Sequence, residues 1–416
     1  MKLKRILALT AASLMALTGL AGCGDSSSSK SDTAESKAES SAAESTADSA
    51  AAESGQDDSK QDDSKPADDT PKPIRDISAW DLVKEMTYGW NLGNTMDATG
   101  KNGLGNETAW QPVKTTKGVF DLLTKDGFNL ARIPVTWGDH MDESYKIDPE
   151  WMARVHEIVD YAIDDGMFVI LNTHHEEWYF PTEENKEQDK EQLKALWEQV
   201  AEEFKNYDEH LIFEGLNEPR LRGTAKEWNG GDKSSREIVA EYEKVFYDTV
   251  RASGGNNAKR ILMMTGYAAS TNQNCLKAVY LPEGDDKIIV SVHAYLPYSF
   301  ALDTKGTSKY DPNNSDIKNL FRTLNTTFIS KNIPVIVGEY GSMNKTHENG
   351  EQNIADRVQC VTDYLTAAKE LGIPCVWWDN NAVFGNGENF GLMNRDVMGA
   401  EWYFPEIVEA IKKVYS

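Results

Sequence analysis

The chain has 416 residues, and its 67 aspartate and glutamate residues outnumber its 43 lysine and arginine residues, which gives a net charge of −24 at pH 7. So acidic a protein repels nucleic acid phosphates and anionic lipid headgroups, which argues against both as partners and favours a neutral or cationic ligand. The length would allow two or three domains, but the first part of the chain lacks the composition of a folding domain.

Residues 1–23 have the pattern of a secretory signal. Lys2, Lys4 and Arg5 precede an apolar run that ends in L-A-G-C at Cys23. The run is too short to be a membrane-spanning helix. Its ending resembles a bacterial lipobox, so we expect Cys23 to be lipidated and the protein to be secreted and anchored to the outer face of a bacterial membrane. An ordinary signal peptide with a chance cysteine is the alternative.

Residues 24–73 are predicted to form a disordered tether. They are rich in Ser, Ala, Asp and Glu, contain 13 acidic and 5 basic residues, and repeat the pentapeptide Q-D-D-S-K. Such a segment cannot bury enough apolar surface to offset the entropy lost on ordering. We therefore expect this segment to act as an extended tether, and residues 74–416 to form the folded domain.

In residues 74–416, short apolar runs alternate with stretches that have helical periodicity. The predicted strands are Gly89–Leu92, Asn129–Pro134, Phe168–His174, Leu211–Asn217, Arg260–Thr265, Ile288–His293, Val335–Glu339 and Cys375–Trp378. The predicted helices are Thr116–Lys125, Pro149–Asp165, Lys186–Phe204, Ser235–Ser253, Ser315–Ser330, Asn353–Leu371 and Phe404–Val414. Eight such strands, with helices between them, predict an α/β fold, the (β/α)8 TIM barrel. An open doubly wound sheet is the alternative, but no G-x-G-x-x-G follows the first strand.

Two of these strands end in a glutamate. The stretch L-I-F-E-G-L-N-E-P-R stops at Asn217 and Glu218, because Pro219 cannot donate to a sheet, and P-V-I-V-G-E-Y-G delivers Glu339. Since the carboxyl ends of barrel strands form one face, both carboxylates are predicted to meet there. The other strands also end in polar or aromatic residues, among them Asn91, Arg132, His174, Tyr267, His293 and Asp379.

These motifs resemble glycoside hydrolase family 5. The matching stretches run in the family's order from Trp90 to Asn380: W-N-L-G-N, R-I-P-V, N-T-H-H-E, G-L-N-E-P, H-A-Y, G-E-Y-G and W-W-D-N. The similarity is greatest to the endo-β-1,4-glucanase branch, which also contains enzymes that act on xyloglucan, mixed-linkage glucan and xylan. It implies a retaining hydrolase with a β-glucan polysaccharide as substrate and no cofactor.

The resemblance implies that Glu218 is the acid/base and Glu339 the nucleophile. It adds five supporting residues: Arg132, His174, Asn217, His293 and Tyr295. We expect Arg132 to hold Glu339 ionised, whereas Glu218, beside neutral Asn217 and His293, is expected to keep its proton near neutrality. Tyr295 is expected to hydrogen-bond the nucleophile, and Asn217 a sugar hydroxyl.

A second set of residues is predicted to bind sugar: Asn94, Trp137, His175, Trp178 and Trp378. Trp378, rather than its neighbour Trp377, is expected to form the floor of the subsite on the non-reducing side. Other aromatic residues lie near strand ends, and Trp228 could serve either packing or binding.

Metal chemistry is not expected, because H-H-E-E at His174 lacks the H-E-x-x-H spacing and no cysteine lies near the strand ends. The three remaining cysteines are predicted to be small buried hydrophobes with at most one bridge among them: Cys275, Cys360 and Cys375. A monomer is expected, with membrane contact only through the lipidated N-terminus.

Three alternatives remain open. A transporter's substrate-binding lipoprotein would share the lipobox but needs two lobes. A non-catalytic sugar-binding barrel would not be expected to keep both glutamates together with Arg132 and Tyr295. Within the enzyme class, the preferred substrate could be xyloglucan, mixed-linkage glucan, xylan or mannan, because loops of unknown shape decide it.

Overall fold

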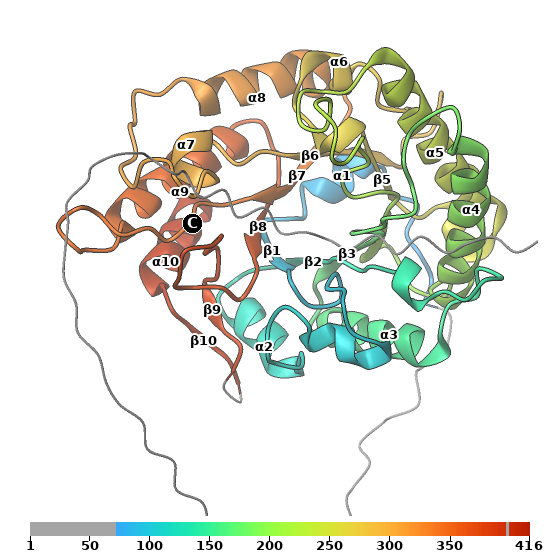
Figure 1. Cartoon of the computed structure of the whole chain (residues 1–416), viewed down its shortest axis with the longest axis horizontal. Coiled ribbons are helices and arrows are strands. Elements are labelled where there is room, and N and C mark those ends of the chain that lie inside the picture. Colours follow the sequence, from blue (N-terminus) through green and yellow to red (C-terminus); the bar gives the residue numbers. More distant parts are fainter. Residues whose placement is uncertain (1–71, 397–398) are drawn as a thin grey trace, which may run out of the picture. The chain divides into compact units, whose positions relative to one another are not determined.

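The computed structural model describes residues 72–396 and 399–416. Eight parallel strands form a closed barrel in chain order, and β1 pairs with β8 to close it (Figure 1). The strands are β1 (Tyr88–Leu92), β2 (Leu130–Ile133), β3 (Phe168–Asn172), β4 (Leu211–Glu214), β5 (Leu262–Thr265), β6 (Ile288–His293), β7 (Val335–Tyr340) and β8 (Cys375–Asp379). The predicted barrel is confirmed, and the open sheet is excluded. The predicted signal peptide, Cys23 and nearly all of the predicted tether lie outside the described residues.

Helices surround the barrel, and all seven predicted helices are present with shifted ends (Figure 1). They are α2 (Lys117–Lys125), α3 (Pro149–Asp164), α4 (Lys186–Glu203), α5 (Lys233–Ala252), α8 (Asp316–Thr327), α9 (Ile354–Lys369) and α10 (Pro405–Tyr415). Shorter helices are α1 (Ala79–Val83), α6 (Gln273–Leu276) and α7 (Tyr298–Ala301), and β9 (Met393–Asn394) pairs antiparallel with β10 (Glu401–Trp402). None of the described helices is both long and apolar enough to cross a membrane.

Side-chain caps start two of the long helices. Asp148 accepts a hydrogen bond from the backbone of Glu150 at the start of α3, where Pro149 needs no donor of its own. At the start of α5, Asp232 and Ser235 exchange hydrogen bonds in a capping box. These caps satisfy backbone donors that a helix leaves unpaired, so the helix boundaries are encoded locally.

The barrel interior has an apolar lower layer and a polar upper layer. Alternate strand residues point inward, and the lower layer consists of Leu130, Ile170, Ile212, Met263, Ile289, Ile336 and Val376, which pack against Ala79, Leu82 and Val83 of α1. Two residues further along β2, β3 and β4, the same parity places Arg132, Asn172 and Glu214 in the buried upper layer. The apolar layer and α1 fill the lower end of the barrel, so the polar groups are concentrated at the carboxyl ends of the strands.

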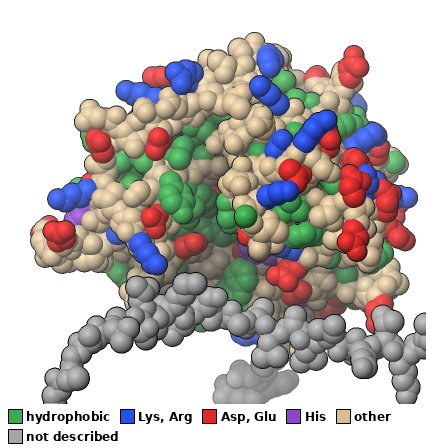
Figure 2. Space-filling model, turned by 45° about the horizontal axis from the view of Figure 1, so that its top comes forward, with side chains coloured by type: hydrophobic (Ala, Val, Ile, Leu, Met, Phe, Trp, Pro, Cys, Tyr) green, Lys and Arg blue, Asp and Glu red, His purple; other side chains and the backbone are tan. Residues whose placement is uncertain are grey.

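The three cysteines in the described part are buried and free: Cys275, Cys360 and Cys375. The prediction that they are small buried hydrophobes is confirmed. On the molecular face in Figure 2, apolar side chains gather toward the middle, while charged side chains lie mainly around them.

Candidate active site

The carboxylates of Glu218 and Glu339 converge above the polar layer. An oxygen of each and a ring nitrogen of His293 all lie within 4.8 Å of one another. Inverting glycosidases keep their carboxyl groups about 6.5–9.5 Å apart to admit a water, whereas retaining enzymes keep them about 5–5.5 Å apart. The barrel therefore brings together the two glutamates that the sequence singled out, at a separation that suits direct attack on a bound sugar.

Glu339 at the end of β7 is held by three groups. Arg132 donates to one of its oxygens at 2.9 Å and Tyr295 donates to the other at 2.8 Å, while His293 Nδ1 lies 3.6 Å away. The preceding residue, Gly338, has little free space beside it, because an added Cβ would lie 3.2 Å from the His293 ring and 3.1 Å from the hydroxyl of Ser291. These contacts fix the Glu339 carboxylate in an orientation suited to a nucleophile.

Glu218 forms a close pair with His293, at 2.8 Å between Oε1 and Nδ1. Burial acts to raise the pKa of Glu218, but the hydrogen bond and charge of His293, with Arg220 and His175, outweigh it and lower the pKa. Burial acts to lower the pKa of His293, whereas the charges of Glu339 and Glu218 raise it overall. These directions run against the expectation that Glu218 keeps its own proton near neutrality, because both favour a charged pair of Glu218 and His293.

Arg132 is the buried centre of the site. Its guanidinium donates to Asn217 at 2.7 Å, to Asn91 at 3.0 Å and to Glu214 at 2.7 Å, in addition to Glu339. The expected contact of Arg132 with Glu339 is present, and Asn217 is held in one orientation next to Glu218. Glu214 was missed by the sequence reasoning, although a charged residue inside the apolar run L-I-F-E signals a buried partner.

His174, just after β3, and Trp378, in β8, form a stacked pair. Their rings are 5.6 Å apart and nearly parallel, at 2°. Burial lowers the pKa of both neighbouring histidines, to about 4 for His175 and well below the usual range for His174, so both are neutral near pH 7. Trp378 is 8% exposed, whereas Trp377 is 1% exposed. This difference agrees with the choice of Trp378 as the surface that a sugar could reach.

The structure corrects one of the two predicted loop platforms. Trp137 is completely buried, and its indole nitrogen donates to the carbonyl of Asn172, so it is a core residue and cannot stack on a sugar. Trp178 is partly exposed and is fixed through a hydrogen bond from its indole nitrogen to Glu176. Asn94 is partly exposed after β1, where its backbone has φ of 58° and donates to Asp97.

Two other tryptophans are much more exposed than the predicted platforms. Trp110 is 45% exposed and lies 5.3 Å from the ring of His175, and Trp228 is 62% exposed. The sequence offered no signal that would rank them above Trp137, because all three follow strand ends.

Two clusters among the described residues have donor atoms close enough to share a metal ion: Asp97–His174–His175 and Glu218–His293–Glu339. Asp97 already accepts two backbone hydrogen bonds, from Asn94 and Thr95. In the second cluster, each group has the protein partner described above. The absence of a metal requirement stays a prediction.

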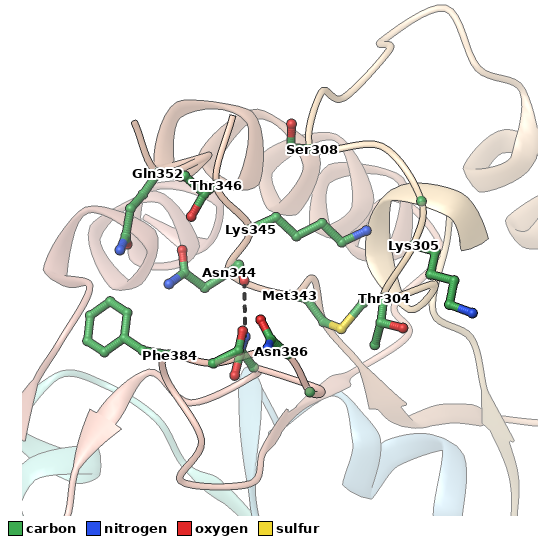
Figure 3. Close-up of a pocket in the computed structure, with 14 residues that line it drawn as sticks. Thr304, Lys305, Ser308, Met343, Asn344, Lys345, Thr346, Gln352, Phe384 and Asn386 are labelled. Atoms are coloured by element: carbon green, nitrogen blue, oxygen red, sulfur yellow. Dashed lines mark hydrogen bonds between the residues drawn. The ribbon is translucent and has the colours of Figure 1, made fainter. Parts of the chain in front are cut away.

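A pocket of about 450 Å³ lies where the loops after β6, β7 and β8 meet (Figure 3). Amide, hydroxyl and lysine side chains line it together with the exposed ring of Phe384, and none of the described residues that line it is acidic. Its wall residue Met343 also packs in one cluster with Trp378 and Phe390. The pocket therefore adjoins the wall that carries Trp378.

Comparisons with known proteins agree with this geometry. The family model described as cellulase (glycosyl hydrolase family 5) matches residues 96–383. Endoglucanase B of Ruminococcus albus is 58% identical over 416 residues, which covers 99% of this chain and 97% of the relative. Endoglucanase 1 of Ruminococcus albus is 62% identical over 338 residues, with coverage of 80% and 81%.

Solved structures of similar proteins carry bound sugars. A GH5-4 broad specificity endoglucanase from Ruminococcus champanellensis with bound cellotriose has a TM-score of 0.78 and 44% identity, with coverage of 82% of this chain and 100% of that one. A GH5 xyloglucan-specific endo-β-1,4-glucanase from a metagenomic library, in complex with cellotriose, has a TM-score of 0.76 and 41% identity, with coverage of 80% and 98%.

Proposed function

The chain belongs to glycosyl hydrolase family 5 and is an endo-β-1,4-glucanase, and we propose that it cleaves internal bonds of cellulose and related β-glucans by double displacement. Glu218 is the general acid/base in this proposal and Glu339 the nucleophile. The observation that carries it is the convergence of both carboxylates within 4.8 Å at the strand ends.

In the first step, Glu339 attacks the anomeric carbon while Glu218 protonates the departing oxygen. Arg132 and Tyr295 keep Glu339 in place for this attack. The proton comes from the pair of Glu218 and His293, because it can move along their 2.8 Å hydrogen bond. The bond to the leaving sugar breaks and an ester forms between Glu339 and the remaining chain.

In the second step, Glu218 removes a proton from water, which then attacks the ester carbon and releases Glu339. Glu218 is a carboxylate at this point because it gave its proton to the leaving oxygen, and esterification has removed the negative charge of Glu339, which lowers the pKa of Glu218 and keeps it ionised as the base. One residue thus serves as acid and then as base because the charge of its neighbour changes.

The substrate range is proposed to extend to substituted glucans. The relatives and neighbours named above act on β-glucans by their names, one of them on xyloglucan. The pocket beside Trp378, with its amides and the exposed Phe384, has a lining suited to a neutral sugar branch (Figure 3). We expect activity on carboxymethylcellulose, mixed-linkage glucan and xyloglucan to exceed activity on xylan and mannan, as initial rates on purified polysaccharides would measure.

The cellular location is also a proposal. We infer secretion and lipidation at Cys23 from the L-A-G-C pattern alone, and the anchored enzyme would act as a monomer on polysaccharide outside the cell. A Cys23→Ala variant that stayed in the membrane fraction of the producing cells would contradict this assignment.

A leaving-group series tests the two catalytic roles. Glu218→Ala is expected to reduce the rate on glucan severely. It should reduce the rate of the first step much less with aryl glycosides whose acidic phenols leave without protonation. Added azide should then accelerate the second step and give a β-glycosyl azide, because a small anion needs no base.

Glu339→Ala should lose activity on both substrate types, because the covalent step itself is lost. Rescue of this variant by azide with formation of the α-azide would still support its role as nucleophile. The reverse pattern, in which the rate of Glu339→Ala depends on the leaving group and the product is the β-glycosyl azide, would contradict the assignment of the two roles.

A further inference from the structure

The loop after β4 joins Glu218 to an exposed tryptophan through one arginine. Arg220 donates to the backbone carbonyl of Glu218 at 3.0 Å, and the same nitrogen lies 3.4 Å from Glu218 Oε2. The guanidinium carbon lies 4.1 Å from the centre of the Trp228 ring. A planar cation over an indole is a favourable contact, so the two side chains hold each other in position.

Glu227 fixes this arrangement from the other side. It accepts from Arg220 Nε at 3.1 Å with one oxygen and from the backbone of Gly223 at 2.8 Å with the other. Arg220 is therefore held by the loop as well as by the acid/base. Trp228 remains 62% exposed, although it is anchored on one face.

The contacts of Glu218 place this tryptophan relative to the bond that is cleaved. Glu218 Oε1 faces His293 and, beyond it, Glu339, whereas Oε2 faces Arg220. Glu339 attacks the sugar that stays on the enzyme, and Tyr295, which donates to Glu339, packs against the cluster that contains Trp378, so Trp378 lies on that side. Arg220 and Trp228 therefore lie across Glu218, on the side of the leaving sugar.

We propose that Trp228 is the platform for the sugar unit that leaves in the first step, and that Arg220 is the positioning residue that ties this platform to Glu218. The inference rests on the proposed role of Glu218. The ligand is a neutral β-linked glucosyl unit, whose flat apolar C–H face can cover an indole while its hydroxyls stay in water. The same surface receives a sugar acceptor in the second step, so it also promotes transfer to sugars over transfer to water.

The role of Trp228 can be tested with two substrates that share the sugars retained by the enzyme and differ in the leaving group. For Trp228→Ala, kcat/KM on cellopentaose should fall roughly tenfold, the size expected for one lost apolar contact. With an aryl cellotrioside bearing an acidic phenol, the same variant should stay within about twofold of wild type, because no sugar leaves. Added cellobiose should also give less transfer product relative to hydrolysis.

Trp110→Ala is the matched control. Trp110 is also exposed, but it contacts His175 next to the stacked pair of His174 and Trp378, on the donor side. Its loss should affect both substrates alike. Trp228→Phe should restore most of the oligosaccharide rate, since a flat ring remains.

Arg220→Gln separates positioning from packing. It should lower kcat/KM on cellopentaose, as Trp228→Ala does. It should also move the alkaline limb of the pH–rate profile to higher pH. The shift is expected because loss of the arginine charge raises the pKa of Glu218, while His293, His175 and Glu339 still face it. Trp228→Ala should leave that limb unchanged.

Equal losses on both substrates for Trp228→Ala, or an unchanged rate on cellopentaose, would overturn the inference. An unmoved alkaline limb in Arg220→Gln would remove Arg220 as a positioning residue. Failure of the proposed function would look different, because the leaving-group dependence of Glu218→Ala would then be absent whatever Trp228 does.

Discussion

At the scale of single residues, the site depends on one buried cation. Arg132 is completely buried and pairs with two carboxylates, Glu214 below it and Glu339 above it. Glu214 is also buried and accepts further hydrogen bonds from Asn172 and Ser291. A buried charge of this kind is tolerated only while its partners remain, so Arg132 links the stability of the barrel to the placement of Glu339, the proposed nucleophile.

This link predicts that Arg132→Met destabilises the protein by about 3–5 kcal/mol, because Glu214 is left as an unpaired buried charge. The double variant Arg132→Met/Glu214→Gln should recover part of that stability but none of the activity, since Glu339 still lacks its arginine. Denaturant unfolding and initial rates would measure the two effects. Full recovery of activity in the double variant would show that Arg132 serves the fold alone.

At the scale of elements, a buried carboxylate ties together the exits of β2 and β3. Glu176, just after β3, accepts hydrogen bonds from the backbone of Trp137 and Gly138, which follow β2, and from the Trp178 side chain. Burial raises the pKa of Glu176 to about 7 despite these three donors. The loop that carries Trp178 is therefore coupled to the protonation of a group that sugars do not contact.

The raised pKa of Glu176 predicts how the stability of the folded protein changes with pH. The folded protein holds this proton up to about pH 7, whereas the unfolded chain releases it near the usual value of 4.5. The free energy of unfolding should therefore fall as pH rises from 4.5 to 7, by up to about 3 kcal/mol from this group. Glu176→Gln should flatten the dependence but not abolish it, because Asp97 also has a pKa raised by burial to about 7. Thermal unfolding across this range would test it, and an equal slope in wild type and variant would contradict it.

At the scale of the whole molecule, the chain begins to pack earlier than predicted. The expected boundary was residue 74, but the backbone of Lys72 already donates to Asn206 at 3.0 Å. Arg75 then binds Glu85 at the surface and the buried carboxylate of Glu209. The segment before α1 is thus fastened to the barrel by backbone contacts and ion pairs, which a composition-based boundary cannot register.

Two truncations test where the folded part begins. A chain starting at Lys72 should unfold at the same temperature as the full protein and keep its activity on soluble glucan, because residues 24–71 are not expected to contribute to the core. A chain starting at Ile77 should lose about 1–3 kcal/mol, since Glu209 is left without its charged partner. Calorimetry on both would decide. If the chain starting at Lys72 unfolded at a lower temperature than the full protein, the preceding residues would have to pack on the barrel.

The sequence by itself determined the barrel and the residues that meet at its face. Alternation of strand and helix periods specifies the eight units, and the period of two within a strand decides which side chains point inward. Because parallel strands of a closed barrel end on one side, Glu218, Glu339, Arg132 and His293 could be placed together without coordinates.

Only the tertiary structure decided which loop tryptophan is exposed and which group shifts the pKa of Glu218. Trp137 and Trp228 both follow strand ends, yet one is buried against Asn172 and the other is open to solvent. The pKa of Glu218 is lowered by His293, 75 positions away in the chain. Side-chain burial in loops and the pKa of a paired group both depend on contacts between segments distant in sequence, and local periodicity carries no record of those contacts.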